Sequence, residues 1–251
     1  MQLDQEALKR IYAENYFKGE EYADYLADRL ILQHNFNKRL NHIQRLKPTL
    51  SHVLEIGCAY GFFAEVLLRK KPDAHYNGYD ISSDAIAYAN QHYGAHFSDQ
   101  NFLDSASESE KYSDCFMWDV IEHLADPSAF IQKIAQESTG NARIYLTTGD
   151  IGSWLARKQG PNWRMIHPPS HLHYFTRQSM GKLLEKAGYQ IEQISYPPVS
   201  RSLRVIYYSL FLLNKKASRL HQWIYKCIPE RAAIRINTRD IFFIVAKKMT
   251  P

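Results

Sequence analysis

The sequence has little cysteine and no long apolar run. Its 251 residues include three cysteines, Cys58, Cys115 and Cys227. They are too few for a disulfide framework and lack the paired spacing of a zinc site, so we expect a reducing compartment. No stretch reaches the roughly 18 consecutive apolar residues of a membrane span. The N-terminal residues carry acids early and lack the apolar core of a signal peptide. These absences predict a cytoplasmic protein.

A large excess of one charge is also missing. The net charge is +5, which gives no reason to expect a nucleic-acid partner. The charge is uneven, because the segment 201–235 holds eight Lys and Arg residues and a single acid, Glu230. Residues 201–226 mix these bases with aromatic and aliphatic side chains. This pattern predicts an amphipathic helix that packs on the sheet. A peripheral contact with an anionic membrane, a dimer contact, or a lid over an acidic or lipid-like acceptor remain alternatives.

Strand and helix patterns alternate from residue 49 onward. Strand patterns fall at 52–57, 75–80, 94–98, 113–118, 142–148, 190–196 and 241–246, and helical patterns at 20–46, 61–70, 83–92, 127–136 and Thr176 to Gly188. Ser82 or Ser83 is expected to cap the helix at 83–92, and 99–112 and 160–174 are expected to be loops. The alternation predicts a Rossmann-like, doubly wound α/β fold with a mainly parallel seven-stranded sheet. The predicted division is an N-terminal helical cap (1–48), a core (49–198 plus 236–251) and a basic amphipathic helical insertion before the last strand (199–235).

Residues 53–63 end an apolar strand in an acid and a small-residue turn, and a helix follows. The third glycine of the dinucleotide pattern G-x-G-x-x-G is absent, because Phe62 stands in its place. A P-loop is excluded because no Gly-Lys-Ser/Thr follows. The turn therefore suits a cofactor without a pyrophosphate. A nicotinamide-dependent oxidoreductase is disfavoured, and a non-catalytic cofactor-binding protein remains an alternative.

Three ordered motifs resemble the class I S-adenosylmethionine-dependent methyltransferases. They are Glu55–Gly61, Gly78–Ser82 and Cys115–Leu124. The resemblance covers roughly 16–196 together with the closing strand, and points to the branch that contains quinone, sugar and polyketide methyltransferases. One departure is Ala59, which replaces the middle glycine of the first motif. A methyl group there should be tolerated unless the backbone φ must be positive.

The resemblance implies S-adenosylmethionine as the cofactor and assigns contacts with it to ten residues: Glu55, Gly57, Ala59, Gly61, Phe62, Asp80, Ile81, Gln100, Trp118 and Asp119. Asp80 is expected to accept both ribose hydroxyls, and Glu55 to add negative potential near the cofactor's ammonium group. Ile81 should lie against the adenine, and Asp99, Gln100 or Asn101 should meet its edge, with Gln100 the assigned residue. Trp118 and Asp119, at the end of the fourth strand, should face the methionine moiety.

The acceptor is expected to be a small or mid-sized metabolite methylated on oxygen, with carbon or nitrogen as the alternative. A hydroxyl acceptor gains from a base, and His171 is the preferred candidate, with His123 second. His167, His173 and Tyr174 are the predicted acceptor contacts. They share a proline-rich loop that should overhang the carboxyl ends of the strands. Alternatively, these histidines only brace the loop.

Asp119, Glu122 and His123 are spaced to share a helical face. The group is similar to a carboxylate and histidine cluster that binds a divalent ion in ubiquinone-pathway O-methyltransferases. Those proteins have Glu where this chain has the shorter Asp119, so we expect no metal.

Overall fold

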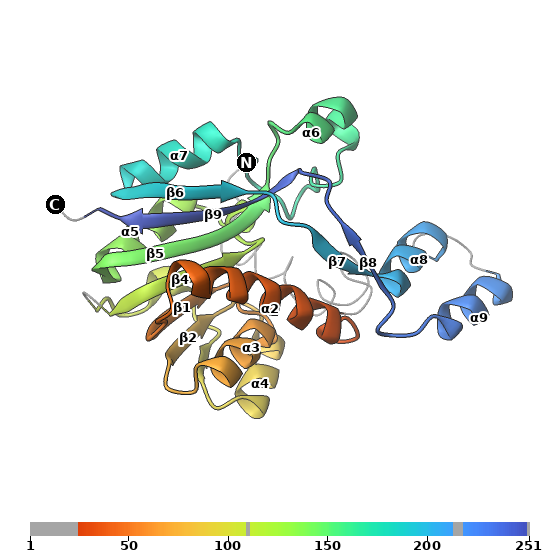
Figure 1. Cartoon of the computed structure of the whole chain (residues 1–251), viewed down its shortest axis with the longest axis horizontal. Helices are drawn as coiled ribbons and strands as arrows, with labels where there is room; N and C mark the ends of the chain where they lie inside the picture. The colour runs from red at the N-terminus through yellow and green to blue at the C-terminus, as the bar shows by residue number, and fades with distance from the viewer. Residues whose placement is uncertain (1–24, 109–110, 213–217, 250–251) are drawn as a thin grey trace.

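A seven-stranded sheet organises the chain. The computed structural model describes residues 25–108, 111–212 and 218–249. The strand order is β3-β2-β1-β4-β5-β9-β6, and Figure 1 shows this order from β2 to β6. Only β9 runs antiparallel to its neighbours. The prediction of a mainly parallel, doubly wound sheet is therefore confirmed.

The seven strands lie where strand patterns were expected, with small shifts at their ends. They are β1 (His52–Ile56), β2 (His75–Tyr79), β3 (His96–Ser98), β4 (Tyr112–Trp118), β5 (Ser138–Gly149), β6 (Tyr189–Ser195) and β9 (Ile241–Lys248). The largest difference is at β5, which begins four residues earlier than expected. The preceding helix ends at Glu137, and the strand starts without an intervening loop.

Within the described residues, five helices flank the sheet and a sixth precedes the loop at 160–174. They are α2 (Arg29–Leu46), α3 (Phe62–Lys70), α4 (Ser83–His92), α5 (Pro127–Glu137), α7 (Arg177–Lys186) and, before the loop, α6 (Trp154–Gln159). Thr176 caps α7 as expected, since its side chain accepts from the Ser179 N–H. Ser82 stands at the N-cap of α4, but its side chain makes no capping hydrogen bond. Helix α6 was not predicted. The helix expected at 20–46 begins at Arg29; residues 20–24 lie outside the described residues and 25–28 form a turn.

Two apolar clusters cover the two faces of the sheet. One joins α2, α3 and α4 to the sheet and contains Leu40 and Phe63, and the other joins α5 and α7 to it and contains Ile131 and Met180. Leu40 is fully buried, and truncating such a leucine to alanine costs about 2–5 kcal/mol. The described part of the predicted N-terminal cap, α2, thus shares the core of the sheet.

Residues 199–236, called the arm below, differ from the helical insertion that was expected. They begin with β7 (Val199–Ser202) and end with β8 (Ala233–Ile236), which pair into an antiparallel two-stranded ribbon. Between them lie α8 (Leu203–Phe211) and α9 (Arg219–Cys227). β-branched residues in both short strands favour pairing over helix. In the part of the chain that the structure describes, no helix is long and apolar enough to cross a bilayer.

Candidate active site

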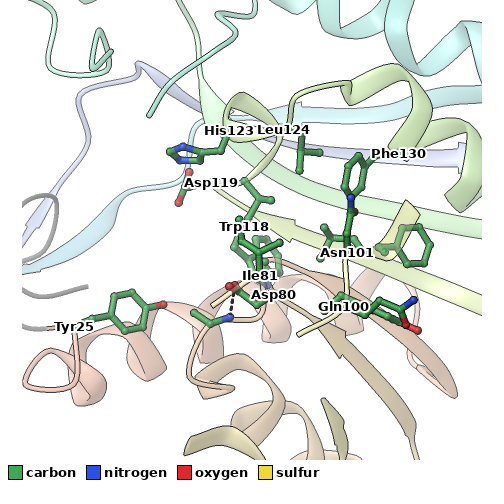
Figure 2. Close-up of a pocket in the computed structure, with 16 residues that line it drawn as sticks. Tyr25, Asp80, Ile81, Gln100, Asn101, Trp118, Asp119, His123, Leu124 and Phe130 are labelled. Carbon is green, nitrogen blue, oxygen red and sulfur yellow. Dashed lines mark hydrogen bonds between the residues drawn. The ribbon is translucent and has the colours of Figure 1, made fainter. Parts of the chain in front are cut away.

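A cavity lies at the carboxyl ends of β1, β2 and β4, where ligands bind in open α/β sheets. It holds about 790 Å³, including its open mouth. Figure 2 shows the side chains around it. The lining residues are Tyr25, Ile56, Gly57, Ala59, Tyr79, Asp80, Ile81, Gln100, Asn101, Phe102, Trp118, Asp119, Val120, His123, Leu124 and Phe130.

The turn after β1 forms one wall, and its backbone is left-handed at three positions. Gly57 and Gly61 both have φ of 73°, and Ala59 has φ of 44°. A Cβ atom at Gly57 would lie 2.2 Å from Cγ2 of Val120, so glycine is required there by space as well as by conformation. The φ of Ala59 is positive, which is the condition under which its methyl group was not expected to be tolerated freely. An L-residue in this region costs about 1–2 kcal/mol.

Asp80 joins this turn to the turn after β2. Its Oδ2 accepts from the Ala59 N–H at 2.9 Å, and its Oδ1 accepts from the Ser82 N–H at 2.9 Å. Figure 2 shows the first of these bonds. Burial raises the pKa of Asp80, while the two backbone hydrogen bonds oppose that rise. Each carboxylate oxygen has a second lone pair, so the same group can accept hydroxyls from a ligand in the cavity.

The end of β4 contributes polar atoms that lack a protein partner. Trp118 Nε1 and Asp119 Oδ1 are buried without a hydrogen bond among the described residues, and both side chains line the cavity. Asp119 has φ of 56°, and its N–H donates to the Thr147 carbonyl at 3.0 Å. Buried polar atoms are normally satisfied. A donor and an acceptor are therefore available here to a ligand that carries complementary groups.

The opposite wall is apolar, with polar groups at its edge. Ile81, Phe102, Leu124 and Phe130 line it, which suits a flat aromatic ring. Gln100 donates from Nε2 to the Asp104 carbonyl at 3.0 Å. Its Oε1 therefore remains the acceptor that can meet the edge of such a ring.

Three of the ten predicted cofactor residues do not line the cavity. Glu55 points to the face of the sheet that holds Val53, because side chains alternate along a strand. There it is 2% exposed and accepts a hydrogen bond from the Tyr76 hydroxyl. Burial, with a contribution from Asp80, raises its pKa to about 8. The side chain of Glu55 therefore lies outside the cavity in which it was expected to add negative potential.

Gly61 and Phe62 support the turn from behind. Gly61 is the N-cap of α3, and an added Cβ would lie 3.0 Å from Tyr93. Phe62 is 1% exposed and stacks on Tyr25 with ring centroids 5.5 Å apart. Both residues shape the site through the backbone and the core, and neither has a side-chain atom at the cavity wall.

His123 is the predicted acceptor-side residue that lines the cavity. It lies in a short 3₁₀ turn, Ile121–His123, where an α-helix start was expected. Its Nδ1 donates to the Ser170 carbonyl at 2.9 Å. A carbonyl only accepts, so the neutral ring carries its proton on Nδ1 and its basic lone pair on Nε2.

His171 lies behind His123 and does not line the cavity. Its ring meets the His123 ring edge to face, with centroids 4.5 Å apart, and it is 7% exposed. Its Nδ1 donates to the Met165 carbonyl at 2.7 Å. The loop is held there because the N–H groups of Leu172 and His173 donate to the Glu122 carbonyl at 2.9 and 3.1 Å.

The other predicted acceptor contacts lie outside the cavity. His167 bonds the Ser170 hydroxyl at 2.9 Å, and His173 packs near Phe175, with ring centroids 6.2 Å apart. Tyr174 is 36% exposed. The loop folds back onto the turn after β4 and does not overhang the cavity with these three side chains. This matches the alternative in which the histidines brace the loop.

Glu122, His123 and His171 form a group that could hold a cation. One ligand atom from each lies within 4.8 Å of the others. Glu122 is 2% exposed, and neither of its carboxylate oxygens has a hydrogen bond within the described chain. Burial, then the charge of Asp119, raises its pKa to about 8. This group differs from the expected one, because His171 takes the place that helical spacing gave to Asp119.

Several cavity residues were not predicted from the motifs. Ile56 ends β1 and Tyr79 ends β2, each next to a residue that was assigned to the cofactor. Leu124 is the last residue of the third motif. Their adjacency to assigned residues was a usable signal. Tyr25 comes from the segment before α2, and no local pattern connects it to the cavity. Only the fold brings it there.

Comparison with known proteins identifies the family. A family model described as a methyltransferase domain matches residues 21–194, which is most of the chain. The chain therefore belongs to this methyltransferase family. With the cavity built at the turn after β1 and at Asp80, it is an S-adenosylmethionine-dependent methyltransferase.

Individual relatives are more distant. The ubiquinone biosynthesis O-methyltransferase of Aeromonas salmonicida (strain A449) is 23% identical over 168 residues, which cover 61% of this chain and 70% of that protein. The solved structure of magnesium protoporphyrin IX methyltransferase from Synechocystis PCC 6803 with bound S-adenosylhomocysteine has a TM-score of 0.59 at 15% identity, and covers 98% of this chain and 100% of its own. The plantazolicin methyltransferase complex with S-adenosylhomocysteine has a TM-score of 0.58 at 15% identity, and covers 98% of this chain and 91% of its own. These structures support the fold.

Proposed function

We propose that the chain transfers the methyl group of S-adenosylmethionine to an oxygen atom of a small or mid-sized acceptor that enters beside His123. The observation that carries this proposal is the position of His123. It lines the cofactor cavity, and its bond to Ser170 fixes the tautomer that leaves Nε2 basic. The O-methyltransferase among the relatives agrees with an oxygen acceptor.

The cofactor is proposed to lie along the carboxyl ends of β2, β1 and β4. Asp80 accepts the ribose hydroxyls, and Ile81 and Gln100 contact the adenine face and edge. Gly57 and Ala59 let the methionine end approach the backbone. Trp118 Nε1 and Asp119 Oδ1, which have no hydrogen-bond partner among the described residues, supply a donor and an acceptor for its carboxylate and ammonium groups.

Methyl transfer is a single displacement at carbon, in which the acceptor oxygen bonds the methyl group as the carbon–sulfur bond breaks. Much of the catalysis is placement of the oxygen in line with that bond. A base that takes the hydroxyl proton typically adds about 10²–10⁴-fold. His123 is the proposed base, and His171, whose ring packs edge to face against it, is a positioning residue.

The experiment is release of S-adenosylhomocysteine from S-adenosylmethionine with matched panels of phenols, amines and carbon acids. We expect turnover with a hydroxyl acceptor. His123→Gln should lower kcat by about 10²-fold or more and leave S-adenosylhomocysteine affinity nearly unchanged. His173→Gln, which alters a loop histidine outside the cavity, is the matched control. Turnover confined to amines or carbon acids, or a fully active His123→Gln enzyme, would refute the proposal.

The same cluster makes a divalent cation the competing explanation. Glu122, His123 and His171 could hold one, and it would polarise the acceptor oxygen in place of a base. Dialysis against a strong chelator decides between the two. Full turnover after metal removal supports the base, whereas loss that a divalent cation restores supports the metal.

A further inference from the structure

The arm places an apolar surface away from the core. Its root is fixed, because the side-chain amide of Asn35 on α2 pairs with both backbone groups of Ser200, at 2.8 and 2.9 Å. Beyond this root the ribbon of β7 and β8 leads to α8 and α9, which project past the sheet in Figure 1. β6 runs parallel to β5, since both pair antiparallel to β9. The arm therefore follows the carboxyl end of β6, on the side of the sheet at which the cofactor cavity opens.

Helix α9 has two distinct faces. Its inner face contacts α8, where the His221 Nδ1 bonds the Tyr207 hydroxyl at 2.6 Å and Tyr225 lies 6.1 Å from Tyr208 between ring centroids. Its outer face carries Leu220 and Trp223, which are 62% and 63% exposed. None of its described residues is buried. Apolar side chains of this size at i and i+3 normally face a core.

Helix α8 also exposes large apolar side chains. Leu210 and Phe211, at its C-terminal end, are 54% and 40% exposed. This set of four large exposed side chains on α8 and α9, called the strip below, is too prominent to be the scattered exposure that is normal for a surface. It therefore suits an apolar environment outside the described residues.

The charge around this strip is almost entirely positive. The arm holds eight basic residues and one acid, a surplus of seven against +5 for the whole chain. The acid, Glu230, is paired with Arg204 at 3.1 Å. The exposed bases are Arg201, Arg219, Lys226, Arg231 and Arg235.

We propose that the arm binds the surface of an anionic lipid bilayer, with Leu220 and Trp223 inserted at the level of the headgroups and the bases on the lipid phosphates. An exposed amphipathic helix with tryptophan and leucine on one face and bases beside them is suited to that interface. A second copy fits less well, because a twofold contact would bring two basic surfaces together. The bilayer would then face the carboxyl ends of the strands, where the cavity opens.

Tryptophan fluorescence tests insertion directly. Trp118 and Trp163 are buried, whereas Trp154 and Trp223 are 68% and 63% exposed. In a Trp154→Phe background, Trp223 is therefore the exposed fluorophore. Vesicles of phosphatidylcholine with about one-third phosphatidylglycerol should shift its emission to the blue and expose it to quenching by brominated acyl chains. Pure phosphatidylcholine vesicles should produce a much smaller change.

Flotation of the full chain with the same vesicles measures affinity. The Leu220→Ser/Trp223→Ser variant should lower binding about tenfold or more, and Arg219→Gln/Lys226→Gln should lower it about fivefold per base at low salt. The matched controls lie on α6, where Trp154→Ser and Arg157→Gln/Lys158→Gln alter an equally exposed tryptophan and neighbouring bases. Both controls should float like the native chain.

Three results would overturn the proposal. One is the absence of binding to anionic vesicles at low salt, and another is equal binding of the native chain and Leu220→Ser/Trp223→Ser. The third is a dimer in light scattering that the outer-face variant converts to a monomer, without lipid binding by either. That result would assign the strip to a second copy of the chain.

Discussion

Gly57 is the most constrained position of the cofactor turn, and Gly57→Ala tests why. Two separate costs are expected. The backbone has φ of 73°, which costs an L-residue about 1–2 kcal/mol. The new Cβ would also lie 2.2 Å from Cγ2 and 3.0 Å from Cγ1 of Val120, and overpacking of this kind typically costs about 1–3 kcal/mol. The sum predicts a loss of about 2–5 kcal/mol in the free energy of unfolding.

A double-mutant cycle separates the two costs. Val120→Ala removes both clashing methyl groups, and leaves the Cβ at residue 120 about 3.2 Å from the new methyl. Urea denaturation of the native chain, both single variants and the double variant gives the coupling energy. We expect the double variant to be about 1–3 kcal/mol more stable than additivity predicts, while the conformational cost remains. Strict additivity, or a native-like Gly57→Ala variant, would refute the geometry assigned to this turn.

Three further predictions concern the turn after β1 and the residues around it. Ala59→Gly should raise stability by about 1 kcal/mol because glycine has no Cβ penalty at φ of 44°, and a Tm lowered in calorimetry would contradict this. Asp80→Asn should weaken S-adenosylhomocysteine binding about 10- to 100-fold in titration calorimetry, with Ser83→Ala as the control; unchanged affinity would remove Asp80 from the ribose site. Glu55 has a pKa of about 8 in the folded chain and an ordinary value near 4.3 when unfolded, so the folded state keeps a proton that the unfolded chain loses. Stability should therefore fall by up to about 1.4 kcal/mol per pH unit between those values, and Glu55→Gln should flatten that slope in urea titrations. An unaltered slope would show that Glu55 ionises normally.

The sheet could be predicted because its signals are local. Most strands are short runs that contain β-branched or aromatic residues, and helices such as α3 and α5 follow within a few positions. The arm was the exception. Val199–Ser202 and Ala233–Ile236 pair across more than 30 residues, and neither strand has a sequence pattern that identifies its partner.

The cofactor half of the site could also be predicted from the sequence, because its residues follow strands whose carboxyl ends meet on one side of a parallel sheet. Glu55 shows the limit of proximity in sequence. It is two residues from Gly57, yet strand alternation turns its side chain into the core against Tyr76. Position within a motif did not reveal which face the side chain occupies.

The acceptor half was less predictable. His123 and His171 are 48 residues apart, and they meet because the loop donates two N–H groups to the Glu122 carbonyl. A backbone contact of this kind leaves no trace in residue type. The sequence could name the histidines, but only the fold distinguishes the one that lines the cavity from those behind it.

The measurement that tests the central claim most directly is a crystal structure of the chain with S-adenosylhomocysteine. It should show both ribose hydroxyls on the Asp80 carboxylate, the adenine against Ile81, and the sulfur on the side of the cavity that His123 lines. A ligand bound elsewhere, or a ribose without contact to Asp80, would contradict the account.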